Sequence, residues 1–334
     1  MSEPFEERCR SLLRSLGLCR SGQALEIRRL SGGVASDIAA VTAGERTVCV
    51  KFALEKLRVD EEWFAPVRRG KAEFAWLQFA GSVVPAAVPA LHGWSDAANG
   101  FAMEYLAGPD VLSWKSDLMA AGADRGEAAA LAEIIGRIHA RSTAPGFDRG
   151  AFDNGADFDA LRTDPYLRFT IARHPDLSRR LNALADRLSA CRIALVHGDV
   201  SPKNVLLRDG RPVLLDAECA SMGDPAFDVA FCLNHLLIKS IHLPASGDDL
   251  LRAAEHLWQT YSPHVVWEDV RGLEARAAAL LPALMLARVD GKSPVEYLSA
   301  RDRNRIRALA RPLVATPADH LRTVFETVQL ASQP

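Results

Sequence analysis

The first third of the chain alternates short apolar runs with turn residues, a pattern that favours strands. The predicted strands are LEIRRL (25–30), IAAVTAG (38–44), ERTVCVKFAL (45–54), VPALHGWS (88–95) and GFAMEYL (100–106). The apolar period becomes helical over residues 2–16 and again over about residues 60–80. These elements predict a small α+β region built on one sheet.

Beyond residue 108 the pattern is mostly helical. Residues 126–143 place apolar side chains at i, i+3, i+4 and i+7, which is typical of a helix with one buried face. Residues 225–330 predict one helix after another, whereas residues 143–160, rich in Gly, Asp and Phe, predict an irregular loop. The expected fold class is therefore α+β with two lobes: a β-rich lobe over 1–103, a hinge at 104–108 and a helical lobe over 109–334.

The composition is that of an ordinary globular protein, with 334 residues, 49% hydrophobic, 25% charged and a formal net charge of −2. We therefore expect neither nucleic acid nor a membrane surface as partner. No apolar run approaches the ~18 residues of a membrane span, and the acidic start MSEPFEERCR does not resemble a signal peptide. The cysteines form no C-x-x-C pair, so we expect reduced thiols in a cytoplasmic protein. The protein is expected to be a monomer or a homodimer.

The chemistry is concentrated in residues 195–220, LVHGDVSPKNVLLRDGRPVLLDAECA. An apolar strand leads to Asp199, and Asn204 follows five residues later, where a hairpin begins. The hairpin turns at Asp209-Gly210 and its second strand ends at Asp216. Two carboxylates and an amide oxygen therefore meet at one sheet edge, and hard oxygen ligands of this kind suit Mg²⁺.

The spacing D-x-x-x-x-N followed by a strand-end Asp is that of phosphoryl-transfer sites. There one Asp receives the acceptor hydroxyl, while the Asn and the second Asp hold the metal ions. The alternative is a solvated loop beside an Asp-Gly hairpin. The complete spacing, with an apolar strand on both sides, favours phosphoryl transfer from ATP with Asp199, Asn204 and Asp216 as the catalytic residues.

This hypothesis requires a Gly-rich turn after the first strand and a lysine on the third strand. The turn is present at Ser31-Gly32-Gly33, although most such pairs of glycines only make hairpins. Lys51 lies within the apolar strand VCVKFAL, where an unpaired charge costs free energy. The alternative for Lys51 is an edge-strand lysine whose ammonium group reaches solvent.

A helical glutamate should orient that lysine. Glu73 is the best candidate, because its helix carries Phe74 and Leu77 for packing. Glu61 and Glu62 are weaker candidates, since they read as solvated acids of a first helical turn.

HGDVSPKN and LLDAECASMGDPAFDVA resemble the catalytic loop and the metal-binding segment of the aminoglycoside phosphotransferase and choline kinase-like family. The resemblance covers roughly residues 25–330 and is clearest from 195 to 236. It implies a bilobal protein kinase-like fold with ATP and Mg²⁺ as cofactors. It also implies residue roles: Asp199 as base, Asn204 and Asp216 as metal ligands, Lys51 and Glu73 at the phosphates, and Met103, Glu104 and Leu106 in a hinge that binds adenine.

The acceptor is expected to be a small molecule with a hydroxyl group and not a protein. The loop reads H-G-D, without the arginine that senses an activation-loop phosphate, and only 11 residues separate Asp216 from Asp228. Asp228 is expected to accept hydrogen bonds from the catalytic-loop backbone, and Asp224 to cap a helix. Glu218 either assists the metal site or accepts a hydrogen bond beside it. The alternatives are an aminoglycoside-type antibiotic kinase and a non-catalytic nucleotide-binding pseudokinase.

Basic residues are the most conspicuous candidates for the acceptor pocket. Arg288, Lys292 and Arg168, with Tyr166 nearby, would repel a polycationic drug but would pair with a carboxylate or phosphate. Two alternatives remain open from the sequence. Acidic residues could converge in the pocket instead, namely Asp290, Glu296, Asp248 and Asp249, or aromatic residues could form a cage for choline, namely Trp258, Tyr261, Trp267 and Tyr297.

Overall fold

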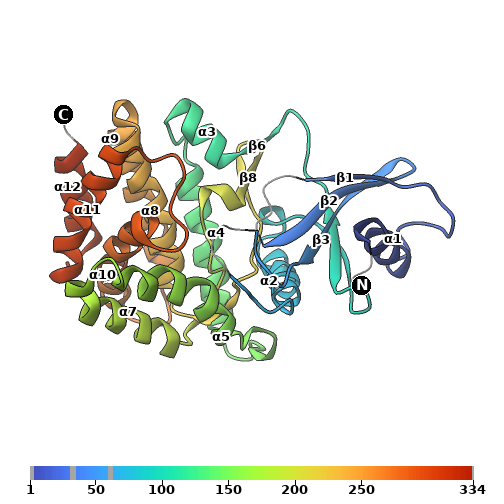
Figure 1. Ribbon diagram of the computed structural model, residues 1–334, viewed down its shortest axis with the longest axis horizontal. Helices are drawn as coiled ribbons and strands as arrows, with labels where there is room; N and C mark the ends of the chain where they lie inside the picture. The colour runs from blue at the N-terminus through green and yellow to red at the C-terminus, as the bar shows by residue number, and fades with distance from the viewer. Residues whose placement is uncertain (1–3, 31–34, 59–62, 333–334) are drawn as a thin grey trace.

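The computed structural model describes residues 4–30, 35–58 and 63–332. A β-rich part that contains α1 lies at one end, and a larger helical part that ends in α12 lies at the other (Figure 1). The antiparallel strands of the main sheet follow the order β1-β2-β3-β5-β4. Their bounds are β1 Glu26–Arg29, β2 Ser36–Ala43, β3 Arg46–Ala53, β4 Leu91–Ser95 and β5 Gly100–Glu104, which confirms the five predicted strands.

The alternation of side chains along β3 decides what each face of the sheet contacts. Val50 and Phe52 point to the face covered by α1 (Phe5–Ser15), where they pack with the buried Leu12. Cys49 and Lys51 point to the opposite face, where α2 (Arg69–Val83) lies. Lys51 is paired with Ile38 on one side and Phe101 on the other, so it lies on a central strand and the edge-strand alternative is wrong.

The helix predicted over about residues 60–80 begins at Arg69 within the described residues. Pro66 lies just before the first turn of this helix, because proline lacks an N–H and is tolerated before or at the start of a helix but not in its interior. Residues 59–62, with Glu61 and Glu62, lie outside the described residues, as does the Ser31-Gly32-Gly33 turn.

The helical part is organised around α8, which is buried along its whole length from Ala226 to Ile241. It packs against α9 and α10, and a helix that is buried on all sides occupies a core position. The helices are α3 Trp114–Ala121, α4 Glu127–Ser142, α5 Gly155–Phe158, α6 Phe169–Ile171, α7 Ser178–Ala190, α8 Ala226–His242, α9 Gly247–Tyr261, α10 Val270–Asp290, α11 Ala300–Ala315 and α12 Leu321–Ser332. Short 3₁₀ turns lie at Pro85–Ala87, Gly150–Phe152, Pro175–Leu177, Pro202–Asn204, Pro244–Ser246 and Ser262–His264.

The loop predicted over residues 143–160 is only partly irregular. It includes α5 and continues into η3, a π-helical segment over Asp159–Arg168. Phe158 anchors this segment, because its ring packs edge-on against Phe227 at 4.9 Å. Pro165 lies inside η3, where its missing N–H interrupts an ordinary α-helical ladder. The prediction holds over residues 143–154, apart from one 3₁₀ turn, but is wrong from Gly155 onward, where Phe158 belongs to the core.

Two small sheets hold the catalytic segment. They follow the orders β6-β8-β9 and β10-β7, with β6 Val111–Ser113, β7 Ala194–Val196, β8 Val205–Arg208, β9 Arg211–Leu214 and β10 Ser221–Gly223. The predicted hairpin is confirmed, and both tip residues are left-handed, with φ of 50° at Asp209 and 73° at Gly210. β6 and β10 were not predicted, because three residues are too few to reveal a period.

Among the described residues no single helix is long and apolar enough to cross a membrane. Only α8 taken together with the helical stretch Pro244–His264, bent by 117°, passes by length and composition.

Candidate active site

The loop after β7 is held in place by a glycine and a buried carboxylate. Gly198 has a φ of +76°, and a Cβ there would lie 2.7 Å from Cβ of Cys219, so no other residue fits without movement. The Asp228 carboxylate accepts hydrogen bonds from the amides of His197 (2.7 Å) and Gly198 (2.8 Å). The expected role of Asp228 is thereby confirmed.

Asp228 is itself supported by a side chain from another helix. His139 Nε2 on α4 lies 3.2 Å from its carboxylate, and His139 Nδ1 lies 2.8 Å from the Tyr261 hydroxyl. Burial alone would raise the pKa of Asp228, but the His139 and backbone hydrogen bonds outweigh it and the pKa is lowered. The carboxylate therefore remains an acceptor for the loop amides.

His197 supports the same loop as a neutral imidazole. Burial lowers its pKa, more than the neighbouring carboxylates raise it. Its Nδ1 accepts from the Asp199 amide at 3.1 Å, and its Nε2 lies 3.1 Å from the Leu215 carbonyl, to which it donates. One imidazole thus connects the loop to the strand end that precedes Asp216.

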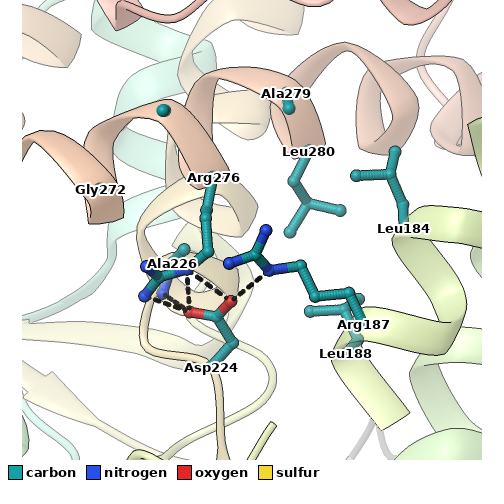
Figure 2. A pocket seen from close by; sticks show the side chains of 10 residues that line it. Leu184, Arg187, Leu188, Asp224, Ala226, Gly272, Arg276, Ala279 and Leu280 are labelled. Carbon is teal, nitrogen blue, oxygen red and sulfur yellow. Dashed lines mark hydrogen bonds and ion pairs between the residues drawn. The ribbon is translucent and has the colours of Figure 1, made fainter. Parts of the chain in front are cut away.

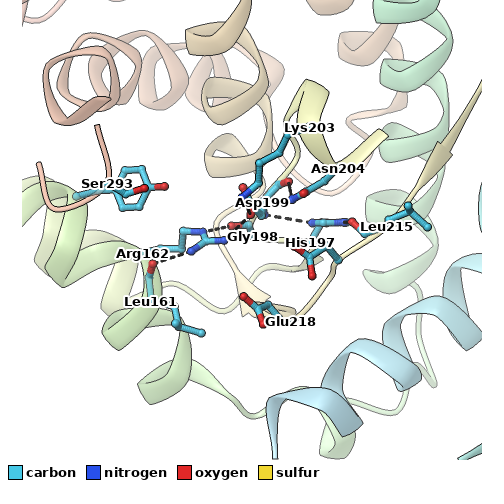
Figure 3. A network of polar contacts seen from close by, with 12 residues as sticks. Leu161, Arg162, His197, Gly198, Asp199, Lys203, Asn204, Leu215, Glu218 and Ser293 are labelled. Carbon is cyan, nitrogen blue, oxygen red and sulfur yellow. Dashed lines mark hydrogen bonds and ion pairs between the residues drawn. The ribbon is translucent and has the colours of Figure 1, made fainter. Parts of the chain in front are cut away.

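Asp199 lies between two basic side chains (Figure 3). Arg162 of η3 approaches to 2.8 Å from Oδ2, and Lys203 Nζ lies 3.6 Å from the same oxygen. Asn204 donates its amide nitrogen to the Asp199 carbonyl at 3.0 Å. Arg162 also donates from Nε to the Gly198 carbonyl at 2.5 Å, so it binds both the backbone and the carboxylate of the loop. Sequence reasoning missed Arg162, because 37 positions separate it from Asp199.

Asp216 meets the upstream lysine. Lys51 Nζ lies 2.7 Å from Glu73 Oε1 and also contacts Asp216 Oδ1. Glu61 and Glu62 are not needed for this pairing. Burial lowers the pKa of Lys51, but the charges of Asp216 and Glu73 outweigh that effect and the pKa is raised. Asp216 has a φ of 67°, a left-handed conformation that is uncommon for any residue with a side chain.

Glu218 forms a separate ion pair. Its Oε2 lies 3.1 Å from Nε of Arg69, which is fully buried and also donates to the carbonyls of Ala35, Leu54 and Ala65. Arg69 therefore joins the start of β2, the end of β3 and the segment between β9 and β10 that contains Glu218. The hypothesis that Glu218 accepts a hydrogen bond beside the metal site fits this geometry.

A cavity of about 330 Å³ lies between the main sheet and the catalytic hairpin. It is lined by nearly all the described candidates, namely Lys51, Glu73, Met103, Glu104, Leu106, Asn204 and Asp216. Apolar side chains complete it, among them Leu30, Ile38, Leu206 and Leu215. A mostly apolar cleft with charged groups at one end is the shape that a nucleotide needs.

The donor set fits Mg²⁺. Among the described residues no group of three or more His, Cys, Asp or Glu side chains could hold a metal ion. Mg²⁺ commonly uses only one or two protein ligands and takes phosphate oxygens and water for the rest. Asp216 and the amide oxygen of Asn204 provide such a pair at the cavity, since Asn204 uses its nitrogen on the backbone.

Asp224 has a structural position (Figure 2). Its carboxylate accepts from the Ala226 amide at 3.0 Å, as a cap of α8 would, and receives Arg276 Nε at 2.9 Å. Arg187 lies 3.8 Å away. With these partners Asp224 holds α8 against α10 and does not face the nucleotide cavity.

The predicted acceptor candidates are divided by the structure. Arg168 forms ion pairs with Asp164 and Asp186 at the surface, each at 2.8 Å, so the prediction that it lines the pocket is wrong. Arg288 is buried and donates to the Tyr166 hydroxyl at 3.1 Å. The difference arises because residues two apart on a helix point to nearly opposite sides, so Tyr166 is turned inward and Arg168 outward.

The alternative acidic pocket does not form. Asp290 is enclosed by Arg307 (2.8 Å) and His174 (2.9 Å), and Glu296 pairs with Lys115. Asp248 and Asp249 are exposed at the start of α9.

The four aromatic residues proposed for a choline cage do not gather in one place. Trp258 stacks on Tyr261 with ring centroids 6.1 Å apart, and Trp267 lies 6.3 Å from His139. Tyr297 packs instead against His242, with ring centroids 5.0 Å apart.

Comparisons with known proteins agree with this geometry. Residues 26–264 match the model of the phosphotransferase enzyme family, APH. A methylthioribose kinase of Citrobacter koseri is 29% identical over 135 residues, which cover 38% of this chain and 30% of that protein. The chain thus spans about a third of the length of the curated relatives that it matches.

Solved structures extend the likeness over nearly the whole chain. A choline/ethanolamine kinase family protein of Mesorhizobium loti has a TM-score of 0.56 at 18% identity, covering 97% of this chain and 98% of that one. An amicoumacin kinase in complex with AMP-PNP and Ca²⁺ has a TM-score of 0.55 at 14% identity, covering 99% and 100%. At these identities the likeness shows the fold, which is protein kinase-like. Together with the family match, it establishes that the chain belongs to the phosphotransferase enzyme family.

Proposed function

We propose that this protein transfers the γ-phosphoryl group of ATP to a hydroxyl of a small molecule. The observation that carries the proposal is the convergence of Lys51, Asn204 and Asp216 on one cavity, with Asp199 five residues before Asn204 on the same loop. The names of the relatives support it, since they are kinases of methylthioribose, choline or ethanolamine, and amicoumacin. A cytoplasmic location is favoured because ATP is available in the cytoplasm and because the six cysteines are free thiols.

The apolar walls of the cavity would hold adenine, with Met103, Glu104 and Leu106 in the hinge between the lobes. Glu104 is fixed there by an ion pair with Arg208 at 3.0 Å. When ATP binds, Lys51, oriented by Glu73, would lose its contact with Asp216 and would contact oxygens of the α- and β-phosphates instead. The Gly-rich turn at Ser31-Gly32-Gly33 is also proposed to bind the nucleotide.

Mg²⁺ held by Asp216 and Asn204 would neutralise charge on the phosphate oxygens. Asp199 would accept the proton of the acceptor hydroxyl while the hydroxyl oxygen bonds to the γ-phosphorus and the bond to the β–γ bridging oxygen breaks. ADP and a phosphate ester are the products. Arg162 and Lys203 fix the direction in which the Asp199 carboxylate points, so the acceptor must approach from the remaining side.

The test is a coupled ADP-release assay with MgATP and a panel of alcohols that includes methylthioribose, choline, homoserine, sugars and amino sugars. We expect acceptor-dependent release that Asp199→Ala abolishes while MgATP binding stays near wild type. A variant that keeps a tenth or more of the wild-type kcat would contradict the assignment of Asp199. ATP binding without any acceptor-dependent release would favour a pseudokinase.

A further inference from the structure

A group of basic side chains lies outside the lining of the nucleotide cavity and is connected to Asp199 through Tyr166 and Arg162. His235 and Lys239 are one turn apart on α8, and Arg288 lies on α10. Their exposed fractions are 6%, 1% and 8%. Lys115 of α3 is close enough to shift the pKa values of both His235 and Lys239. Together these four residues are called the basic cluster below.

The two cations of the cluster that are buried have neutral partners. Arg288 Nη1 donates to the Tyr166 hydroxyl at 3.1 Å and to the carbonyl and Oγ of Ser293 at 2.5 and 3.2 Å. Its Nε is buried and has no hydrogen-bond partner among the described residues. Lys239 Nζ donates to the Tyr297 hydroxyl at 3.3 Å and lies 5.1 Å from the centre of that ring.

Within the described part of the chain, no carboxylate forms an ion pair with Lys239 or Arg288. Glu296 is the acid that influences both, and it is already paired with Lys115. A buried cation without a counter-charge costs free energy, so such a group persists where function requires it. Lys239 and Arg288 thus lack a negative partner that would balance a positive charge at either residue.

The cluster is continuous with the proposed catalytic base. Arg288 contacts Tyr166, whose ring lies 5.8 Å from the guanidinium of Arg162, and Arg162 pairs with Asp199. Phe231 makes a second connection, because its ring lies 5.4 Å from that of His235 and 5.8 Å from the Arg162 guanidinium. None of the four cluster residues lines the nucleotide cavity.

The lowered pKa values of Lys239 and His235 agree with the lack of a negative charge close to the cluster. Burial, assisted by the charges of Lys115 and Arg288, lowers the pKa of Lys239 to about 7, and Cys232 and Glu296 only partly oppose this shift. Burial also lowers the pKa of His235, assisted by Arg288, Lys239, Lys203 and Lys115. A bound anion would offset this mutual repulsion.

We propose that the acceptor carries, besides its reacting hydroxyl, a carboxylate or phosphate group that Lys239 and Arg288 bind. The inference rests on the proposed function and names the substrate class of the same site. An anion held at the cluster directs the opposite end of a small molecule toward Asp199. Polycationic drugs and choline are disfavoured, because they would meet the cluster with like charge.

Two matched pairs of probes test the inference by calorimetry on the full chain with MgADP present. Gluconate is compared with glucitol for the carboxylate, and ribose 5-phosphate with ribose for the phosphate. We expect at least one anion to bind more tightly than its neutral partner by about tenfold or more, and to be the better acceptor when MgATP replaces MgADP. If neither anion reaches that margin, the inference is wrong.

Substitutions test whether Lys239 and Arg288 cause the preference for an anionic acceptor. Lys239→Met and Arg288→Met should each reduce the anion preference by about tenfold, whereas Lys239→Arg should retain most of it. Lys71→Met, which removes an exposed lysine of α2, is the matched control and should leave it unchanged. Thermal unfolding of each variant shows whether the fold is retained. If a methionine variant does not fold, the inference is tested by whether Lys239→Arg retains the preference for the anion.

The two proposals fail in different ways. If Lys239→Met weakens MgATP binding as much as anion binding, the cluster serves the nucleotide and the inference is overturned. Efficient phosphorylation of glucitol, ribose or a kanamycin-type drug, without preference for an anion, overturns the inference and leaves the kinase function standing. The absence of ADP release with every acceptor contradicts the proposed function itself.

Discussion

The Asp228 carboxylate accepts a hydrogen bond from the backbone amide of Gly198 at 2.8 Å, across 30 residues of sequence. Its other oxygen accepts from the His197 amide at 2.7 Å. A residue that does not line the cavity thus sets the path of the backbone that carries Asp199. This relationship makes Asp228 a positioning residue.

Asp228→Asn should loosen the catalytic loop, because the amide nitrogen would face a backbone N–H. We expect unfolding to cost about 1–3 kcal/mol less and kcat to fall by about tenfold or more, with a smaller change in the KM for ATP. Chemical denaturation and steady-state kinetics measure both effects. Asp96→Asn, at a side chain that is 80% exposed, is the control. Wild-type kcat in Asp228→Asn would show that the loop does not depend on this carboxylate.

Asp216→Ala should remove the Mg²⁺ dependence of ATP binding, and Asn204→Ala should weaken it less. In the proposed site Asp216 would supply a full negative charge to the metal, whereas Asn204 would supply only a dipole. Calorimetric ATP titrations with and without Mg²⁺ distinguish the two variants. If Asp216→Ala binds MgATP as the wild type does, the metal assignment is wrong.

Arg69→Met should be among the most destabilising changes in the β-rich part of the protein. It would leave Glu218 and several carbonyls buried without their donor. Breaking a buried pair in this way costs about 3–5 kcal/mol. Lys71→Met, two residues along α2 and exposed, should have little effect on the urea midpoint. Equal midpoints for the two variants would contradict the role of Arg69.

Lys239→Met should stabilise the protein, and more at pH 6.5 than at pH 9. The pKa of Lys239 is about 7 in the folded state and near 10.5 when unfolded, so the fold binds fewer protons between these values. Stability therefore rises with pH through that window, and the cost of the lysine is greatest at its lower end. Removing the amine removes this cost. Thermal unfolding at both pH values measures the difference, and a gain that is larger at pH 9 would refute the lowered pKa.

The sequence by itself determined the local elements and the centre of the site. The strands before residue 105 and the hairpin at Asp209-Gly210 followed from short-range periods and turn residues, which act on neighbours. Asp199, Asn204 and Asp216 were found because a single loop and hairpin fix their separation. The pairing of Lys51 with Glu73 was also predictable, since the requirement for an oriented lysine limits the choice to one strand and one helix.

Only the tertiary structure decided which distant side chains surround that centre. Arg162 reaches Asp199 from η3, Arg69 joins three segments, and the basic cluster assembles from α3, α8 and α10. Arg168 and Tyr166 are two residues apart, yet one faces solvent and the other contacts Arg288. The physical reason is that a side chain's direction depends on helix phase and on packing between segments far apart in sequence. Charge counts along the chain do not contain that information, whereas burial and pairing in three dimensions do.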